Sequence, residues 1–101
     1  MWIFVFFDLP AVTKKEKKIH TQFRKLLEKD GFTRFQFSIY IRHCSSKENA
    51  EVHKSRVKNN LPQNGNICIL HVTDKQFGMI DLFRGIEKIQ RPRTPQQLEL
   101  F

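Results

Sequence analysis

The first ten residues constrain this chain more than any other stretch. Residues 1–7 are apolar without a break, and Asp8, Leu9 and Pro10 follow them. The run is rich in aromatic and β-branched side chains and closes at a proline, which is typical of a strand rather than a helix. Because apolar residues occupy successive positions, we expect both faces of this strand to be covered, as in the interior of a sheet.

The strand leaves the carboxylate of Asp8 at its end, where it can meet solvent, a metal ion or a phosphate. The alternative is a plain strand terminator that solvates the chain end or caps a turn. A signal peptide is disfavoured, since no basic residue precedes the run, an acid interrupts it and no small-residue cleavage site follows.

Composition indicates one small, basic domain. The chain has 101 residues, with 18 Lys and Arg against 10 Asp and Glu, a net charge of +8. This balance favours a polyanionic partner, nucleic acid ahead of an anionic membrane, although a generally solvated basic surface is the alternative. A domain this small gains from oligomerisation, so some of its 10 Phe residues are expected to cover a subunit interface. No apolar stretch approaches the length that crosses a membrane.

The two cysteines favour no metal site. Neither Cys44 nor Cys68 lies in a CxxC pair, and no histidine stands at zinc-finger spacing from them. Both fall in strand-like runs, so we expect buried thiols in a reducing cytoplasm.

A basic amphipathic helix is predicted after Pro10. Thr13 and Glu16 form a capping-box pattern at its start, and Gly31 supplies its end. The apolar stripe consists of Ile19, Phe23, Leu26 and Leu27. The opposite face carries Lys14, Lys15, Lys17, Lys18, Arg24, Lys25 and Lys29. That face is either a nucleic-acid contact or the solvated side of the helix.

The remaining chain predicts a bent strand pair, a helix and two further strands. Residues 32–44 alternate with period two and should bend near Phe37 into two strands. Ser45 or Ser46 should cap a second helix. The inner stripe of that helix is predicted to be Ala50, Val57 and Leu61, with Val52 or His53. Residues 66–73 read as another interior strand, residues 77–83 as a shorter one, and residues from 84 onward as an extended tail.

This order predicts an α+β fold of the ferredoxin-like βαββαβ plan, an antiparallel sheet with both helices on one face. A further strand follows the plan near the carboxyl terminus. We therefore expect a ferredoxin-like domain over residues 1–85 and an extended C-terminal tail over residues 86–101. The plan alone does not fix an activity.

Several stretches, in this order and spacing, resemble one family. They are the apolar strand ending in Asp8, the basic helix, FQFSIYIR at 35–42, ICILHVTD at 67–74, FGMI at 77–80 and FRG at 83–85. Over residues 1–85 the chain resembles the CRISPR-associated protein two family, the smaller of the two universal spacer-acquisition proteins, in a variant like those of type II systems.

The resemblance implies a ferredoxin-like homodimer in which the last strand of each chain pairs with the partner's sheet. It implies a scaffold that bridges dimers of the CRISPR adaptation integrase and lies along the incoming double-stranded DNA. It also implies that Asp8 binds a divalent cation such as Mg²⁺ and serves as the catalytic residue of an endonuclease acting on RNA or double-stranded DNA. The alternative is an unrelated ferredoxin-like RNA-binding protein without catalytic activity.

One aspartate per chain does not make a tight magnesium site, since Mg²⁺ prefers an octahedron of hard oxygen ligands. Two Asp8 side chains facing across a dimer axis could form one with phosphate and water. Without a cation the two carboxylates would repel, and at least one would hold its proton above its ordinary pKa. Asp74 and Asp81 are expected to be turn or surface residues. Among the histidines, His43 is the candidate for acid–base work.

Nucleic-acid binding needs only cations on phosphates, without sequence reading, and should weaken steeply with salt. The candidates are Lys14, Lys15, Lys17, Lys18, Arg34 and Arg42. The tail ends in Leu98, Leu100 and Phe101, which resemble the short peptide that binds the replication sliding clamp. We favour the alternative, a strand added to the partner subunit or to the integrase.

Overall fold

The computed structural model describes residues 1–93. The predicted partner-binding residues Leu98, Leu100 and Phe101 lie outside this range. The elements are β1 (Trp2–Asp8), α1 (Lys14–Lys29), β2 (Thr33–Gln36), β3 (Ile39–His43), α2 (Lys47–Lys58), β4 (Asn66–Val72), α3 (Asp74–Phe77), β5 (Leu82–Arg84) and β6 (Glu87–Ile89). Through β4 this is the predicted order of strand, helix, two strands, helix and strand.

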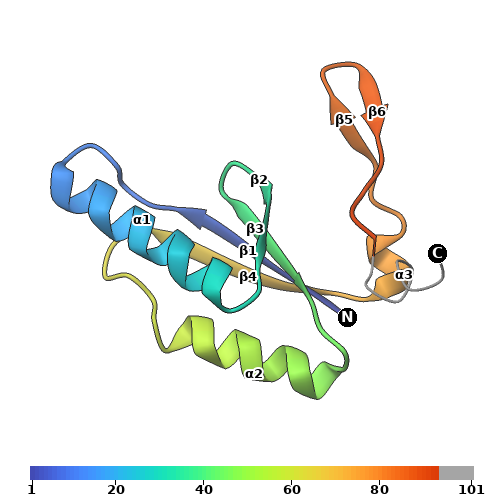
Figure 1. Ribbon diagram of the computed structural model, residues 1–101, viewed down its shortest axis with the longest axis horizontal. Helices are drawn as coiled ribbons and strands as arrows, with labels where there is room; N and C mark the ends of the chain where they lie inside the picture. Colours follow the sequence, from blue (N-terminus) through green and yellow to red (C-terminus); the bar gives the residue numbers. More distant parts are fainter. Residues whose placement is uncertain (94–101) are drawn as a thin grey trace.

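The main sheet has the strand order β2-β3-β1-β4, and each neighbouring pair is antiparallel (Figure 1). β1 lies in the interior, between β3 and β4. Its alternate residues enter two separate apolar clusters, Ile3 and Val5 on one face and Trp2 and Phe4 on the other. The prediction that both faces of this strand are covered is confirmed.

Helices α1 and α2 cover the same face of the sheet (Figure 1). Thr13 and Glu16 form the predicted capping box, and Phe23 and Leu27 are the buried part of the predicted α1 stripe. Ser46 caps α2, which buries Ala50, His53 and Val57. The prediction that Leu61 belongs to the inner stripe of α2 is wrong, because Leu61 follows the end of α2 and is 48% exposed. Val52 is also exposed, so His53 takes the remaining inner position.

The opposite face of the sheet is only partly covered. Trp2, Phe4 and Val72 are buried there with Phe77 of α3, while Cys68 and Leu70 on β4 are exposed. Cys68 and Leu70 pair with Phe6 and Phe4 in the antiparallel register, so all four side chains share this face, which we call the open face.

β4 is therefore not an interior strand, as predicted, but an edge strand of the sheet. Its apolar run resembled β1, yet the residues that follow β4 in the described chain turn away instead of pairing with it. The prediction of two buried thiols holds for Cys44 alone, since Cys68 is exposed.

The segment after β4 differs most from the prediction. The strand predicted over residues 77–83 is wrong for most of its length and holds only for Leu82 and Phe83, which lie in β5. Thr73 and Gln76 form a second capping box that begins the short helix α3, and α3 ends at Phe77. Residues 82–84 and 87–89 then form the two-stranded hairpin β5–β6, so the extended tail predicted from residue 84 is also wrong over these residues. The hairpin extends away from the main sheet (Figure 1). The predicted domain boundary at residue 85 falls at its turn and stays a prediction. Within residues 1–93 no helix is long and apolar enough to span a bilayer.

Candidate functional site

Asp8 lies at the end of β1 with its side chain exposed between two buried neighbours, Phe7 and Leu9. The strand is fixed on both sides here. The Phe7 amide donates to the Ser38 carbonyl at 3.0 Å, and Asp8 is paired in register with Asn66 of β4. A rigid backbone therefore presents one carboxylate at the end of the sheet.

Gly65 allows the start of β4 to approach β1 at this point. Its φ is +93°, and a Cβ added to it would lie 2.7 Å from the Asp8 carbonyl oxygen and 2.6 Å from Leu9 Cδ2. A side chain at this position would collide with the backbone that carries Asp8. Gly65 thus helps to set the position of the carboxylate.

One protomer alone does not supply a magnesium site. Among residues 1–93, no group of three or more His, Cys, Asp and Glu side chains could hold a metal ion. Asp8 could give one hard oxygen ligand to a divalent cation, but the rest of a coordination shell would have to come from elsewhere.

The other acids considered from the sequence make structural contacts. The Met1 ammonium donates to Asp74 at 2.6 Å, and this hydrogen bond lowers the pKa of Asp74. His43 Nε2 lies 3.4 Å from the same carboxylate, within ion-pair range but without hydrogen-bond alignment. Asp81 pairs with Lys88 at 3.0 Å on the hairpin. Both acids have the turn or surface placement that the sequence predicts.

His43 is far from Asp8 within one protomer. It pairs with Trp2 at the opposite end of β1. Asp8 lies six residue steps along the extended strand from Trp2, about 20 Å at the rise of a β-strand. The structure does not bring the candidate acid–base residue to the candidate carboxylate. His20 lies nearer, with its ring 5.6 Å from that of Phe7, and burial together with the Arg24 charge lowers the pKa of His20.

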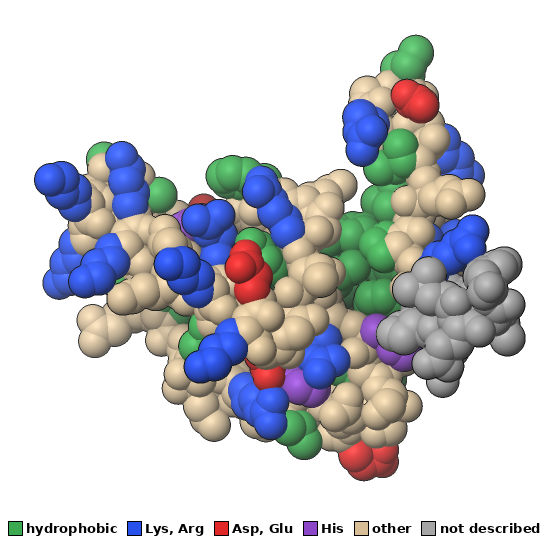
Figure 2. Space-filling model, in the orientation of Figure 1, with side chains coloured by type: hydrophobic (Ala, Val, Ile, Leu, Met, Phe, Trp, Pro, Cys, Tyr) green, Lys and Arg blue, Asp and Glu red, His purple; other side chains and the backbone are tan. Residues whose placement is uncertain are grey.

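Most of the predicted nucleic-acid-binding residues are exposed. Lys and Arg side chains gather over α1 on the face seen in Figure 2. The first turns of the helix carry Lys14, Lys15, Lys17 and Lys18, all exposed. Arg34 is also exposed, with its guanidinium 5.2 Å from the centroid of the Phe37 ring.

Arg42 differs from the others because its guanidinium is used within the protein. Its Nε donates to the Asp30 carbonyl at 2.9 Å, and Nη1 donates to the His43 carbonyl at 2.7 Å. These bonds tie β3 to the end of α1. A nucleic-acid role for Arg42 stays a prediction beside this structural one.

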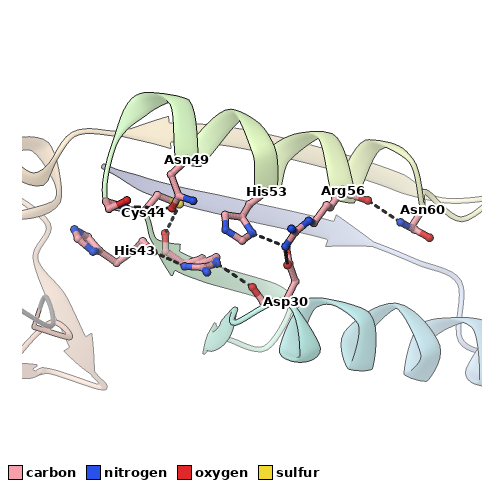
Figure 3. A network of polar contacts seen from close by, with 9 residues as sticks. Asp30, His43, Cys44, Asn49, His53, Arg56 and Asn60 are labelled. Carbon is pink, nitrogen blue, oxygen red and sulfur yellow. Dashed lines mark hydrogen bonds and ion pairs between the residues drawn. The ribbon is translucent and has the colours of Figure 1, made fainter.

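Sequence analysis missed a polar network between α1 and α2 (Figure 3). Asp30 Oδ2 lies 2.8 Å from His53 Nδ1, and Arg56 Nη1 donates to Asp30 Oδ1 at 2.6 Å. Burial alone would raise the pKa of Asp30, but the hydrogen bonds and charges of His53 and Arg56 outweigh it and lower that pKa. The i, i+3 spacing of His53 and Arg56 places them on one side of α2, but nothing in the sequence points to Asp30 as their partner.

Comparison with known proteins settles the family. The family model described as CRISPR associated protein Cas2 matches residues 1–80. This chain belongs to the Cas2 family. Two relatives, each named CRISPR-associated endoribonuclease Cas2, match it over its full length. That of Flavobacterium psychrophilum is 57% identical over 101 residues and 88% of its own length. That of Parvibaculum lavamentivorans is 46% identical over 101 residues and its whole length.

Cas2 membership confirms the resemblance carried by the strand ending in Asp8 and by the stretches at 35–42 and 67–74. The alternative of an RNA-binding protein unrelated to this family is therefore wrong.

Proposed function

We propose that this Cas2-family protein acts in CRISPR spacer acquisition as a ferredoxin-like homodimer that holds double-stranded DNA between dimers of the adaptation integrase. Family membership supports involvement in the CRISPR system. The sheet order β2-β3-β1-β4, with α1 and α2 on one face, supports the ferredoxin-like plan. The observation that supports a homodimer is the partly exposed apolar surface of the open face.

The open face has the composition of an interface core rather than of a surface. Phe4 is buried in it, yet Leu70 beside Phe4 is 48% exposed. The segment that follows adds further exposed apolar side chains, with Met79 at 67%, Phe83 at 56% and Ile86 fully exposed. Exposed apolar side chains gathered on the open face and the segment after it support a protein–protein contact.

In the proposed dimer the open faces of two chains pack together, and the β5–β6 hairpin reaches onto the partner's sheet. β4 is an edge strand, so its outer backbone groups can accept an added strand. This arrangement accounts for a hairpin that extends away from its own sheet (Figure 1). The exposed lysines at the start of α1 would contact DNA phosphates, and the tail carrying Leu98, Leu100 and Phe101 would join the partner or the integrase rather than a sliding clamp.

A second proposed activity is metal-dependent phosphodiester cleavage by paired Asp8 carboxylates. The relatives' name, endoribonuclease, supports a nuclease activity. Because one protomer supplies a single exposed carboxylate, the site would require Asp8 from both chains. A bound divalent cation would activate water and neutralise the phosphate. Asp8 would contribute a fixed ligand, and the lysines that follow it would orient the nucleic acid.

Asp8→Asn tests the two roles, with Glu48→Gln as the control on an exposed acid of α2. We expect Asp8→Asn to abolish Mg²⁺-dependent cleavage of RNA and duplex DNA, while copurification with the integrase and spacer integration persist. Glu48→Gln should leave both cleavage and copurification unchanged. A wild-type protein that does not copurify with the integrase would refute the scaffold role. Cleavage that persists in Asp8→Asn would refute the role of Asp8.

A further inference from the structure

A groove of about 530 Å³ lies between the carboxyl-terminal half of α1 and the end of α2. Its lining combines three cations, one carboxylate, two amides and one apolar side chain. The lining residues are Gln22, Lys25, Leu26, Lys29, Asp30, Arg56 and Asn60. The groove is open to solvent, so a ligand bound there would keep part of its surface exposed. We call this feature the helix groove.

The helix groove is built to attract an anion. Asp30 is paired with Arg56, so the charges of the two lysines in the lining are not cancelled by it. Neither Lys25 nor Lys29 forms an ion pair with an acid in residues 1–93. Even with its bond to Asp30, the side chain of Arg56 is 59% exposed. The lining is therefore net positive, with two lysines beside an Arg56 whose charge is shared with Asp30.

The groove also continues the basic face of α1. Lys14, Lys18, Lys25 and Lys29 are spaced by four, seven and four residues, which places them on one side of a helix. From first to last they span about 22 Å at the helical rise. A phosphodiester chain that follows this row reaches the groove at its end.

We propose that the helix groove binds an unpaired nucleotide of single-stranded nucleic acid, with its phosphate held by Lys25, Lys29 and Arg56. In a duplex the bases are stacked and paired, so only phosphates could reach the rim. An unpaired base can enter between the helices, contact Leu26, and hydrogen-bond to the amides of Gln22 and Asn60. The Asn60 amide nitrogen donates to the Arg56 carbonyl at 2.8 Å, which fixes its orientation and leaves its oxygen as an acceptor.

This site is separate from Asp8. It lies at the carboxyl-terminal half of α1, whereas Asp8 precedes the start of that helix. The inference requires neither cleavage by Asp8 nor assembly with the integrase, so its test can fail or succeed independently of both.

The test compares two charge-matched double variants of the full chain, Lys25→Gln/Lys29→Gln and Lys47→Gln/Lys58→Gln. Lys47 and Lys58 are exposed on α2, and neither is among the residues that line the groove. Binding is measured by fluorescence anisotropy in EDTA, with an unstructured RNA of about 20 nucleotides, longer than typical single-strand site sizes. DNA of the same sequence and a duplex of the same length are measured in parallel.

For the RNA, we expect the groove variant to raise Kd roughly tenfold and the control variant to raise it less than about threefold. The salt dependence of binding should fall by about 1.4 in log–log slope, for two lost phosphate contacts on a single strand. For the duplex, whose bases cannot enter the groove, the groove variant should raise Kd by a clearly smaller factor than it does for the RNA. If the groove variant weakens the binding of single-stranded DNA as much as that of RNA, the phosphate and the base are the contacts. If it weakens the binding of RNA more, the 2′-hydroxyl is a contact as well.

Equal losses for the groove and control variants on RNA would overturn the proposal. So would a groove-specific loss as large for the duplex as for the single strand. Photocrosslinking of wild-type protein to thiouridine-containing RNA provides a second measurement that needs no variant. Crosslinks should map to residues 22–29 and 56–60, and crosslinks confined to other segments would contradict the assignment.

Discussion

Gly65→Ala is the substitution whose cost the structure defines most closely. Gly65 has φ +93°, in the left-handed region, and an added Cβ would lie 2.7 Å from the Asp8 carbonyl oxygen and 2.6 Å from Leu9 Cδ2. The backbone conformation alone costs an alanine about 1–2 kcal/mol. The contact with Asp8 involves backbone, which cannot rotate away, so β1 and the turn before β4 must separate.

We therefore expect Gly65→Ala to lower the free energy of unfolding by about 3 kcal/mol, the sum of left-handed strain and overpacking. Gly85→Ala is the matched control, since φ is +61° there and nothing lies within 4 Å of an added Cβ. That variant should show the conformational cost alone, about 1 kcal/mol. The difference between the two measures the close approach at Asp8.

Urea unfolding followed by circular dichroism, at one fixed protein concentration, gives both values. Gly65→Ala should also impair cleavage more than its stability loss explains, because the carboxylate of Asp8 moves with the backbone. Equal destabilisation of the two variants, within about 0.5 kcal/mol, would show that Gly65 does not hold β4 against Asp8 and would refute this reasoning.

Two further predictions concern the helix network and the open face. The hydrogen bonds of Asp30 lower its pKa despite burial, so its stabilising contribution is present above about pH 4 and is lost as pH falls through the folded-state value. Asp30→Asn should thus cost about 2 kcal/mol at pH 7, and its difference from wild type in urea unfolding should shrink towards pH 3; a difference independent of pH would contradict this. In thiol labelling of the native protein, Cys44 should stay unreactive, since it is buried and burial raises its pKa. Cys68, on the open face, should be protected in the wild type and react rapidly in Leu70→Asp; equal rates in both proteins would show that no partner covers it.

Local patterns in the sequence predicted the elements through β4. The capping box at Thr13 and Glu16, the apolar spacing of α1 and the alternation across residues 32–44 are each carried by neighbouring residues, so one sequence suffices to see them. The run that ends in Asp8 likewise predicted a central strand, because only a strand covered on both faces favours apolar residues at every position.

The errors arose where the outcome depends on residues far apart in the chain. β4 has the apolar content of β1, but its place at the sheet edge depends on which strands pair, and its exposed Cys68 and Leu70 follow from that pairing. The short helix α3 was not predicted, and the strand predicted over residues 77–83 begins at its last residue, Phe77.

The residues of the candidate sites also divide into those that local sequence reveals and those that only the folded chain brings together. Asp8 could be found from its position at a strand end, and the lysines of α1 from their charge. The groove between α1 and α2 could not, because Asp30, Arg56 and Asn60 meet only when the two helices pack on one face of the sheet. Arg42 shows the reverse case, a predicted surface cation whose guanidinium bonds to two backbone carbonyls.

The central claim is that two chains pair through the open face. Sedimentation equilibrium at micromolar concentration, on the wild type and on Leu70→Asp, tests it most directly. Leu70 is 48% exposed within one chain, so an aspartate there should leave the protomer folded. We predict a wild-type mass of twice the 12.1 kDa chain and a folded Leu70→Asp monomer. A wild-type protein that sediments as a folded 12.1 kDa protomer, or a Leu70→Asp variant as dimeric as the wild type, would contradict the account.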